Sequence, residues 1–347
     1  MGRTTVVIIA VMASVWVQAA EPTWVEFSSD LESARVEVVE ASATELDFVV
    51  ELPGVSLESV ATEAGDFVRL SVPGLGRVGN TGEPQLPALR RFIEIPIGAT
   101  VEVDVQPLDK TEIDLAREGV PTRLMPVQLP LPKCDCEEAR NWRFSYKEAS
   151  YAGRVEQPAG ALRGPYTFRD HQIMVLTLSP VSYDVEQSKL EIAHRARITL
   201  LFEGGDVAAT LAAKERLASR HFDAYLGAAT VNLNLDLDAA NWSYPDDAPV
   251  EYLIITPPQF VADLQPFVDW KTSCGFNVTV TTTDVAGTTT TAIKNHISGL
   301  YNGANPPVYI LMVGDSPSPL ATFQQPYGSG GEGGTDLPYV QMDGDLY

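Results

Sequence analysis

The hydrophobic period changes near residue 250, and this change constrains the fold more than any other feature of the sequence. Before it, short runs alternate apolar and polar side chains, which indicates strands with one buried and one solvated face. After it, continuously apolar strands alternate with amphipathic helical segments in the order β-α-β-α-β. Such strands, joined by helices, predict a parallel sheet covered on both faces. The 347 residues should therefore divide into at least two domains of different class.

Residues 21–204 are predicted to form a β-rich antiparallel domain. Runs such as "DFVRLSVPG" and "RITLLFEGG" show period-two alternation, and Gly, Pro and Asp separate them. Many short strands with turn signals between them indicate a sandwich-like or barrel architecture. Residues 205–249 read as a helical segment followed by a polar linker, and residues 250–347 as an α/β domain. The predicted fold class is therefore α+β and multidomain.

The N-terminus has the layout of a secretory signal peptide. Arg3 precedes an apolar run that begins at Val6, and small residues follow at Ala19 and Ala20. The apolar run holds about 12 residues, whereas a membrane span needs roughly 20. We therefore predict that residues 1–20 are cleaved, that the mature protein is secreted, and that it has no membrane span.

The charge balance excludes one class of partner. The chain has 24 Lys and Arg residues against 46 Asp and Glu residues. Nucleic-acid binding needs clustered cations that displace counterions, so we expect no nucleic-acid partner. An acidic balance suits an extracellular protein or one that binds cations.

The cysteines and histidines do not form a recognisable catalytic or zinc-binding pattern. Cys274 precedes a predicted strand and should lie at the amino edge of the sheet, while His296 lies within a helix, so the two are not expected to pair. Cys134 and Cys136 are flanked by acidic residues, which disfavour the thiolate, so they are interpreted as structural. With three cysteines, one pair could form a disulfide and leave one thiol free. The spacing of the histidines indicates no zinc site.

Acidic residues near the end of the chain suggest a calcium site. Asp336, Asp343 and Asp345 fall in the stretch "TDLPYVQMDGDLY", and carboxylates beside glycine can supply hard oxygen ligands for Ca²⁺. The alternative is a solvated acidic turn, and the pattern is not an EF-hand. Asp315 follows the third predicted strand and should lie at the carboxyl edge of the sheet, where parallel sheets place their ligand sites.

Several segments, in order, resemble the gingipain-type cysteine peptidases. "YLIITPPQFVADLQPFVDWKTSCGFNVTV" and "PVYILMVGDSPSPL" are similar to the opening of the family's catalytic domain. Upstream, "SVPGLGRVGNTGEPQLPALRRFIEIPIGATVEV" is similar to the family's propeptide. The resemblance covers roughly residues 25–347.

The resemblance implies a secreted zymogen. A β-rich prodomain would pack on the first half of a caspase-like α/β peptidase domain and keep it inactive. The family cleaves protein or peptide substrates through a Cys thiolate activated by His, and gingipains prefer Arg or Lys and bind calcium. The family's catalytic His and Cys follow later strands, and no residue here matches them, so no catalytic residue is assigned. We therefore expect the chain to be truncated and inactive alone.

Other interpretations stay open at the level of the sequence. The chain could instead be a non-catalytic secreted β-sandwich module that binds ligands or inhibits an enzyme. Arg123 and Lys133 lie in or beside the proline-rich segment 121–132, where such a side chain could block a basic-specific pocket or could simply be solvated. Arg220 and the acidic linker around Asp246 are both candidate maturation regions.

Overall fold

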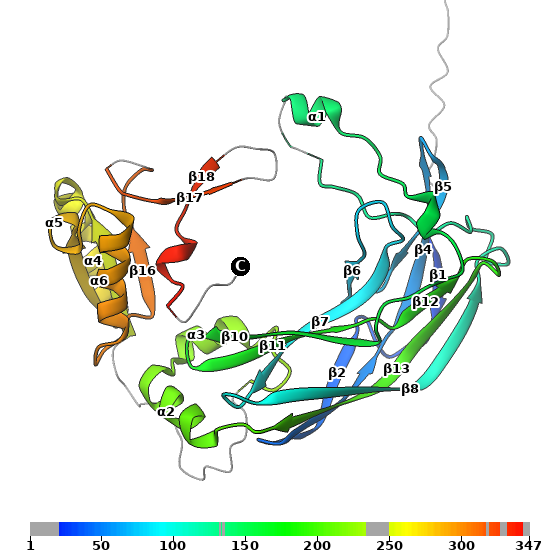
Figure 1. Cartoon of the computed structure of the whole chain (residues 1–347), viewed down its shortest axis with the longest axis horizontal. Coiled ribbons are helices and arrows are strands. Elements are labelled where there is room, and N and C mark those ends of the chain that lie inside the picture. The colour runs from blue at the N-terminus through cyan, green and yellow to red at the C-terminus, as the bar shows by residue number, and fades with distance from the viewer. Residues whose placement is uncertain are drawn as a thin grey trace, which may run out of the picture.

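The protein forms two parts that differ in architecture (Figure 1). The computed structural model describes residues 21–131, 133, 136–233, 250–316, 319–326 and 332–342. We refer to residues 21–233 as the β-rich part and to residues 250–342 as the α/β part. The predicted signal peptide, residues 1–20, lies outside the described residues.

Three antiparallel sheets build the β-rich part. The largest contains β2 (Arg35–Ala41), β3 (Glu45–Glu51), β13 (Lys189–Glu203), β12 (Val181–Asp184), β9 (Arg154–Val155) and β8 (Thr100–Asp114). The second contains β10 (Gly160–Phe168), β11 (His171–Leu178), β7 (Leu86–Ile95) and β6 (Gly76–Val78). The third contains β1 (Thr23–Glu26), β4 (Gly54–Thr62) and β5 (Gly65–Ser71). Alternating side chains of these sheets meet in one core.

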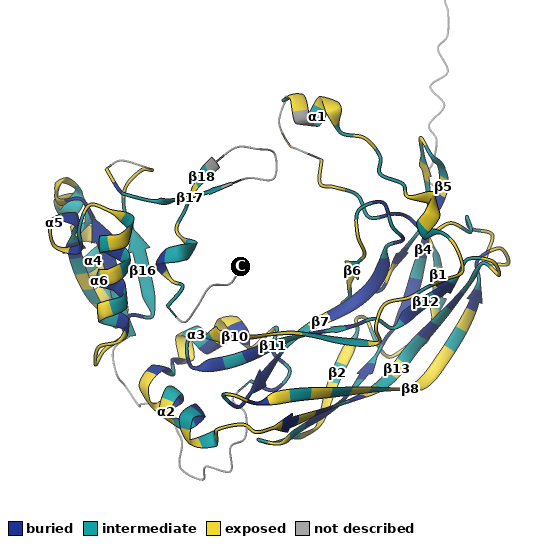
Figure 2. Cartoon of the chain, viewed as in Figure 1, coloured by how far each residue is buried: buried dark blue, intermediate teal, exposed yellow. Residues whose placement is uncertain are grey.

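The core of the β-rich part explains the alternation seen in the sequence. On β3 the side chains of Leu46, Phe48 and Val50 are buried, as are those of Ile198 and Leu200 on the neighbouring β13. A fully buried Leu, Ile or Phe stabilises the fold by about 1.5–3 kcal/mol. β8 pairs with β13 and alternates half-buried with exposed residues along its first half (Figure 2). The predicted antiparallel, sandwich-like architecture is confirmed.

Helices follow the last strand of the β-rich part and pack against it. α2 (Val207–Leu217) begins where the Asp206 carboxylate accepts a hydrogen bond from Ala209 N, and α3 (Arg220–Leu226) follows directly. Ile97 N donates to Thr210 Oγ1 over 2.9 Å, which fastens α2 to the end of β7. The short helix α1 (Glu137–Asn141) and the 3-10 turn η1 (Glu148–Ser150) belong to the crossing segment between β8 and β9.

The α/β part contains the predicted parallel sheet. Its strands are β14 (Val250–Thr256), β15 (Phe276–Thr282) and β16 (Tyr309–Met312), in the order β15-β14-β16. Its helical elements are η2 (Pro258–Phe260), α4 (Val261–Ser273), α5 (Thr283–Ala286) and α6 (Thr290–Tyr301). Both strand pairs are parallel. The α/β half of the fold prediction is therefore confirmed.

A second, smaller core holds the α/β part together. Leu253 and Ile255 of β14 pack with Ile293 and Ile297 of α6. The chain then forms a hairpin of β17 (Phe323–Pro326) and β18 (Glu332–Thr335), followed by the 3-10 turn η3 (Leu337–Tyr339). Tyr339 is buried in this core and donates a hydrogen bond to Ala321 O. Within the described residues, no helix is both long and apolar enough to cross a bilayer.

Candidate functional site

Asp315 lies where the sequence predicted it, at the carboxyl edge of the parallel sheet. It follows β16 after Val313 and Gly314, and Gly314 adopts a φ of 141° that L side chains rarely reach. The Asp315 side chain is exposed, and its Oδ1 accepts a hydrogen bond from Ser316 N over 2.8 Å. Thr256 ends the central strand β14 at the same edge. Asp315 is therefore a rim residue without a partnered acid or base among the described residues.

The cysteines and His296 do not form a catalytic pair in the part of the chain that the structure describes. Cys274 carries a free, exposed thiol at the end of α4, just before the amino end of β15. His296 lies in α6, half-buried, and no contact joins it to Cys274. Cys136 is disulfide-bonded, in agreement with its interpretation as a structural cysteine.

Of the three predicted calcium ligands, the structure describes only Asp336. Asp336 is exposed and directly precedes η3. Asp343 and Asp345 lie outside the described residues. The calcium site at these three positions therefore stays a prediction.

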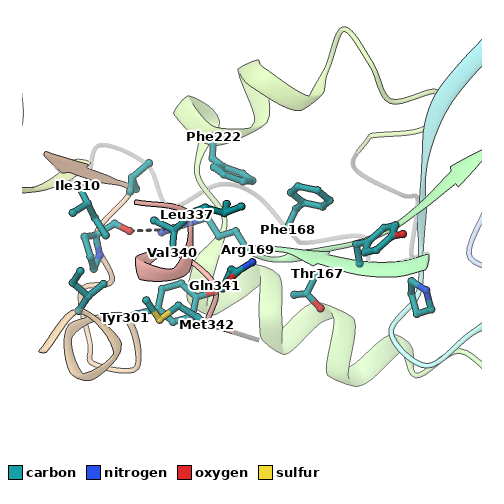
Figure 3. Close-up of a pocket in the computed structure, with 15 residues that line it drawn as sticks. Thr167, Phe168, Arg169, Phe222, Tyr301, Ile310, Leu337, Val340, Gln341 and Met342 are labelled. Atoms are coloured by element: carbon teal, nitrogen blue, oxygen red, sulfur yellow. Dashed lines mark hydrogen bonds between the residues drawn. The ribbon is translucent and has the colours of Figure 1, made fainter. Parts of the chain in front are cut away.

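A junction joins the β-rich part to the α/β part, and Arg169 lies at its centre. Arg169 occupies the turn between β10 and β11 with a φ of 60°, a left-handed conformation that is uncommon for a residue with a side chain. Its guanidinium donates to Leu217 O at the end of α2 over 2.5 Å. It also donates to Pro307 O of the α/β part over 2.9 Å (Figure 3). Burial lowers the pKa of Arg169. One side chain thus connects three segments that are far apart in the sequence.

Side chains of α2 and α3 complete the junction. Arg216 donates to Tyr301 O over 3.1 Å and lies 5.4 Å from the centre of the Tyr301 ring. The His221 ring packs edge-on against Phe276 and Tyr309, with centroid distances of 5.6 and 6.1 Å. Tyr225 and Tyr309 bring their hydroxyl oxygens within 3.5 Å of each other.

The junction holds the amino edge of the parallel sheet. Phe276 is the first residue of β15 and Tyr309 the first residue of β16, and Tyr301 and Pro307 lie in or beside the loop that enters β16. The carboxyl edge that carries Asp315 is at the other end of the same strands. The contacts of the junction therefore leave the edge where parallel sheets bind ligands free of these helices.

A cavity of about 430 Å³ lies between the two parts beside Arg169 (Figure 3). The β-rich part lines it with Phe168 and Phe222, and the α/β part with Ile310, Leu337 and Val340. The lining is mainly apolar, so the cavity extends the contact between the two parts rather than forming a polar reaction centre.

A cluster of buried ionisable side chains lies next to the junction, within the β-rich part. Its members are Glu94 of β7, Asp170 of the β10–β11 turn, His171 of β11, Lys214 of α2 and Asp223 of α3. His171 Nδ1 is 2.8 Å from Glu94 Oε1, and His171 Nε2 is 3.0 Å from Asp223 Oδ1. Lys214 Nζ donates to Glu94 Oε1 over 2.7 Å.

The cluster shifts the ionisation of its members. Burial alone would lower the pKa of His171, but hydrogen bonds to Asp223 and Glu94 outweigh it and raise the pKa to about 9. Burial raises the pKa of Asp170. Burial would also raise the pKa of Glu94, but the contacts with His171 and Lys214 lower it instead.

Comparison with known proteins identifies the family. Residues 28–221 match Propeptide_C25, and residues 245–347 match Peptidase family C25. The chain belongs to the gingipain-type peptidases of family C25. Lys-gingipains of Porphyromonas gingivalis, including those named HG66 and W83, are 32% identical over 332 residues, 92% of this chain. The chain spans 18% of the length of these curated relatives.

Two solved structures of gingipains are also similar to the chain. One concerns the zymogenic latency of gingipain K from Porphyromonas gingivalis, with 28% identity, a TM-score of 0.45, and coverage of 53% of this chain and 99% of that chain. The other is the complex of the RgpB pro- and mature domains, with 15% identity, a TM-score of 0.45, and coverage of 57% and 97%. The chain carries a gingipain propeptide followed by the N-terminal region of the peptidase.

Proposed function

We propose that this chain belongs to the zymogen of a secreted, lysine-specific cysteine endopeptidase, and that its β-rich part imposes latency. The observation that carries the proposal is the order of the two family regions on one chain, residues 28–221 and then 245–347. The lysine preference follows the Lys-gingipains, which are 32% identical to this chain over 332 residues. Hydrolysis through a Cys thiolate and a His base rests on the family, because the described residues contain no such pair.

The contacts of the junction attach the β-rich part to the α/β part, but they do not cover the edge of the sheet where substrate should bind. Arg169, Arg216 and His221 hold the amino edge of the sheet. Substrate should bind at the carboxyl edge. The segment that blocks the substrate site must therefore come from another region of the β-rich part.

Lys133 is the best candidate for the blocking side chain. It is exposed, and it follows Leu129 and Leu131, which are 57% and 60% exposed, in the segment before α1. α1 itself projects from the sheets (Figure 1). Arg123 is held differently, because its guanidinium lies 5.0 Å from the centre of the Phe67 ring within the β-rich part. A lysine side chain that enters a lysine-specific pocket would act as a substrate mimic.

Secretion and calcium binding are further elements of the proposal. Secretion rests on the signal-peptide pattern of residues 1–20. Calcium binding rests on the spacing of Asp336, Asp343 and Asp345.

An inhibition assay tests the proposal. The chain from residue 21 onward is added to a mature Lys-gingipain, and the hydrolysis of a chromogenic lysine peptide is followed. We expect the rate to fall in a saturable way as the chain is added. A rate that stays constant at a large molar excess of intact chain would overturn the proposal.

A further inference from the structure

The buried cluster behind the junction has the donor atoms of a metal site. Side-chain atoms of Asp170, His171 and Asp223 lie within 4.8 Å of one another. His171 Nε2 is 3.0 Å from Asp223 Oδ1 and 3.5 Å from Asp170 Oδ2. Ligand atoms that share an ion at about 2.0–2.2 Å lie about 2.9–3.5 Å apart. These two separations fall within that range, and the third, between the carboxylates of Asp170 and Asp223, is at most 4.8 Å. An ion bound to His171 Nε2 is therefore within reach of both carboxylates.

Asp170 supplies an independent reason to expect a cation. Its side chain is buried, with 2% of the residue exposed, and neither carboxylate oxygen has a hydrogen-bond partner in the described structure. The nearest cationic atoms are His171 Nε2 at 3.5 Å and Lys214 Nζ at 3.8 Å. These ion pairs are too long for hydrogen bonds, and an ionised carboxylate that accepts no hydrogen bond is costly in a protein interior. Two oxygens of one residue are thus available to a ligand of positive charge.

Glu94 orients His171 in the way that a carboxylate beside a metal site orients a metal-binding histidine without binding the metal itself. It faces His171 Nδ1 at 2.8 Å, which leaves Nε2 pointing toward Asp170 and Asp223. Metal-binding histidines commonly donate their second ring N–H to a carboxylate in this way. Lys214 holds the same Glu94 oxygen at 2.7 Å and fixes its position.

The charges of the cluster fit a divalent ion. Three carboxylates and one ammonium leave two negative charges when His171 is neutral, and one divalent cation neutralises them. We propose that Asp170, His171 and Asp223 bind a divalent transition metal of the zinc class, with Glu94 orienting His171. One imidazole nitrogen with carboxylate oxygens suits such a metal better than Ca²⁺ or Mg²⁺, which prefer oxygen ligands. Without metal the raised pKa of His171 keeps both ring nitrogens protonated. Binding breaks the Nε2–H bond, releases that proton to solvent and forms the bond from Nε2 to the metal, which leaves the neutral ring counted above.

A metal at this site would stabilise the junction, because its ligands lie in the same elements as the residues of the junction. Asp170 is next to Arg169 in the β10–β11 turn, and Asp223 lies in α3 with His221 and Tyr225. A bound metal ties this turn to α3. It therefore fixes the two elements that hold the amino edge of the parallel sheet.

Metal binding is tested on the chain from residue 21 onward. The protein is stripped with a chelator and equilibrated with ZnCl₂, MnCl₂ or CaCl₂; bound metal and melting temperature are then measured. We expect about one zinc ion per chain. We also expect a rise of about 5–10 °C in the melting temperature when zinc is at a hundredfold excess over its Kd.

Variants separate the site from adventitious binding. Asp170→Asn and His171→Gln should bind zinc at least tenfold more weakly, whereas His194→Gln, whose ring stacks on Phe27 outside the cluster, should bind it normally. Metal-free Asp170→Asn should melt no lower than the parent, because Asp170 accepts no hydrogen bond and its ion pairs with His171 and Lys214 are long, 3.5 and 3.8 Å. The proposal is wrong if the parent binds no zinc, if Asp170→Asn binds it equally well, or if only Ca²⁺ raises the melting temperature.

Discussion

Replacing Arg216 with alanine should loosen the α/β part while leaving the β-rich core unchanged. Arg216 contacts the α/β part through its hydrogen bond to Tyr301 O and its position over the Tyr301 ring. A net hydrogen bond contributes about 0.5–1.5 kcal/mol, and an exposed cation–π contact about 0.5–1 kcal/mol. Alanine preserves helix propensity in α2. The loss should therefore be about 1–2.5 kcal/mol, which is about 5- to 70-fold in an equilibrium constant.

Amide hydrogen exchange measures this loss directly. The amides of Ile254 and Ile255 lie in β14, the central strand of the parallel sheet, and exchange when the α/β part unfolds. That unfolding breaks the junction, so their exchange should accelerate by the same factor of about 5–70. Amides of β3 should keep their exchange rates, because β3 lies in the separate core of the β-rich part.

Two variants serve as controls for the exchange experiment. Glu215→Ala changes an exposed neighbour in α2 and should leave the exchange of β14 unchanged. Arg216→Lys keeps the positive charge but loses the planar guanidinium, so it should accelerate the exchange of the β14 amides by an intermediate factor. The reasoning is refuted if Arg216→Ala matches Glu215→Ala, or if β3 accelerates as much as β14.

Three further predictions concern the blocking segment, the smaller core and the calcium site. Lys133→Ala should weaken inhibition of a Lys-gingipain at least tenfold, as expected when one partner of a buried charge pair is lost. Arg123→Ala should change the inhibition constant little. Equal effects of the two variants would contradict the assignment of Lys133 as the blocking side chain. Ile293→Ala, at a fully buried position of the α/β core, should destabilise the α/β part by about 2–5 kcal/mol. A fall in melting temperature by calorimetry that is confined to the β-rich part would contradict the existence of two separate cores. Asp336→Asn should weaken Ca²⁺ binding measured by isothermal titration, and unchanged affinity would remove Asp336 from the site.

The two architectures could be predicted because each depends on a local pattern. On β3 the buried apolar residues Leu46, Phe48 and Val50 stand at every second position, which gives the period of two. On β14, Leu253, Ile254 and Ile255 are all buried, which gives a continuous apolar run. The position of Asp315 followed from strand direction alone. These features need no knowledge of distant contacts.

The junction and the buried cluster could not be predicted, because they depend on contacts between distant segments. The ring nitrogens of His171 face Glu94 and Asp223, which are 77 and 52 residues away in the sequence. No short spacing between histidines or acidic residues signals this arrangement. The helical segment after residue 204 likewise reads as a connection, but Lys214 is buried against Glu94 and makes α2 part of the β-rich part.

We propose that the β-rich part is the prodomain of a lysine-specific peptidase. The most direct test of this proposal is a comparison of the inhibition constants of the chain for a lysine-specific and an arginine-specific gingipain under identical conditions. We expect inhibition at least tenfold tighter for the lysine-specific enzyme, because Lys133 is exposed in the segment before α1 and Arg123 is held against Phe67. Tighter inhibition of the arginine-specific enzyme, or no inhibition of either, would contradict it.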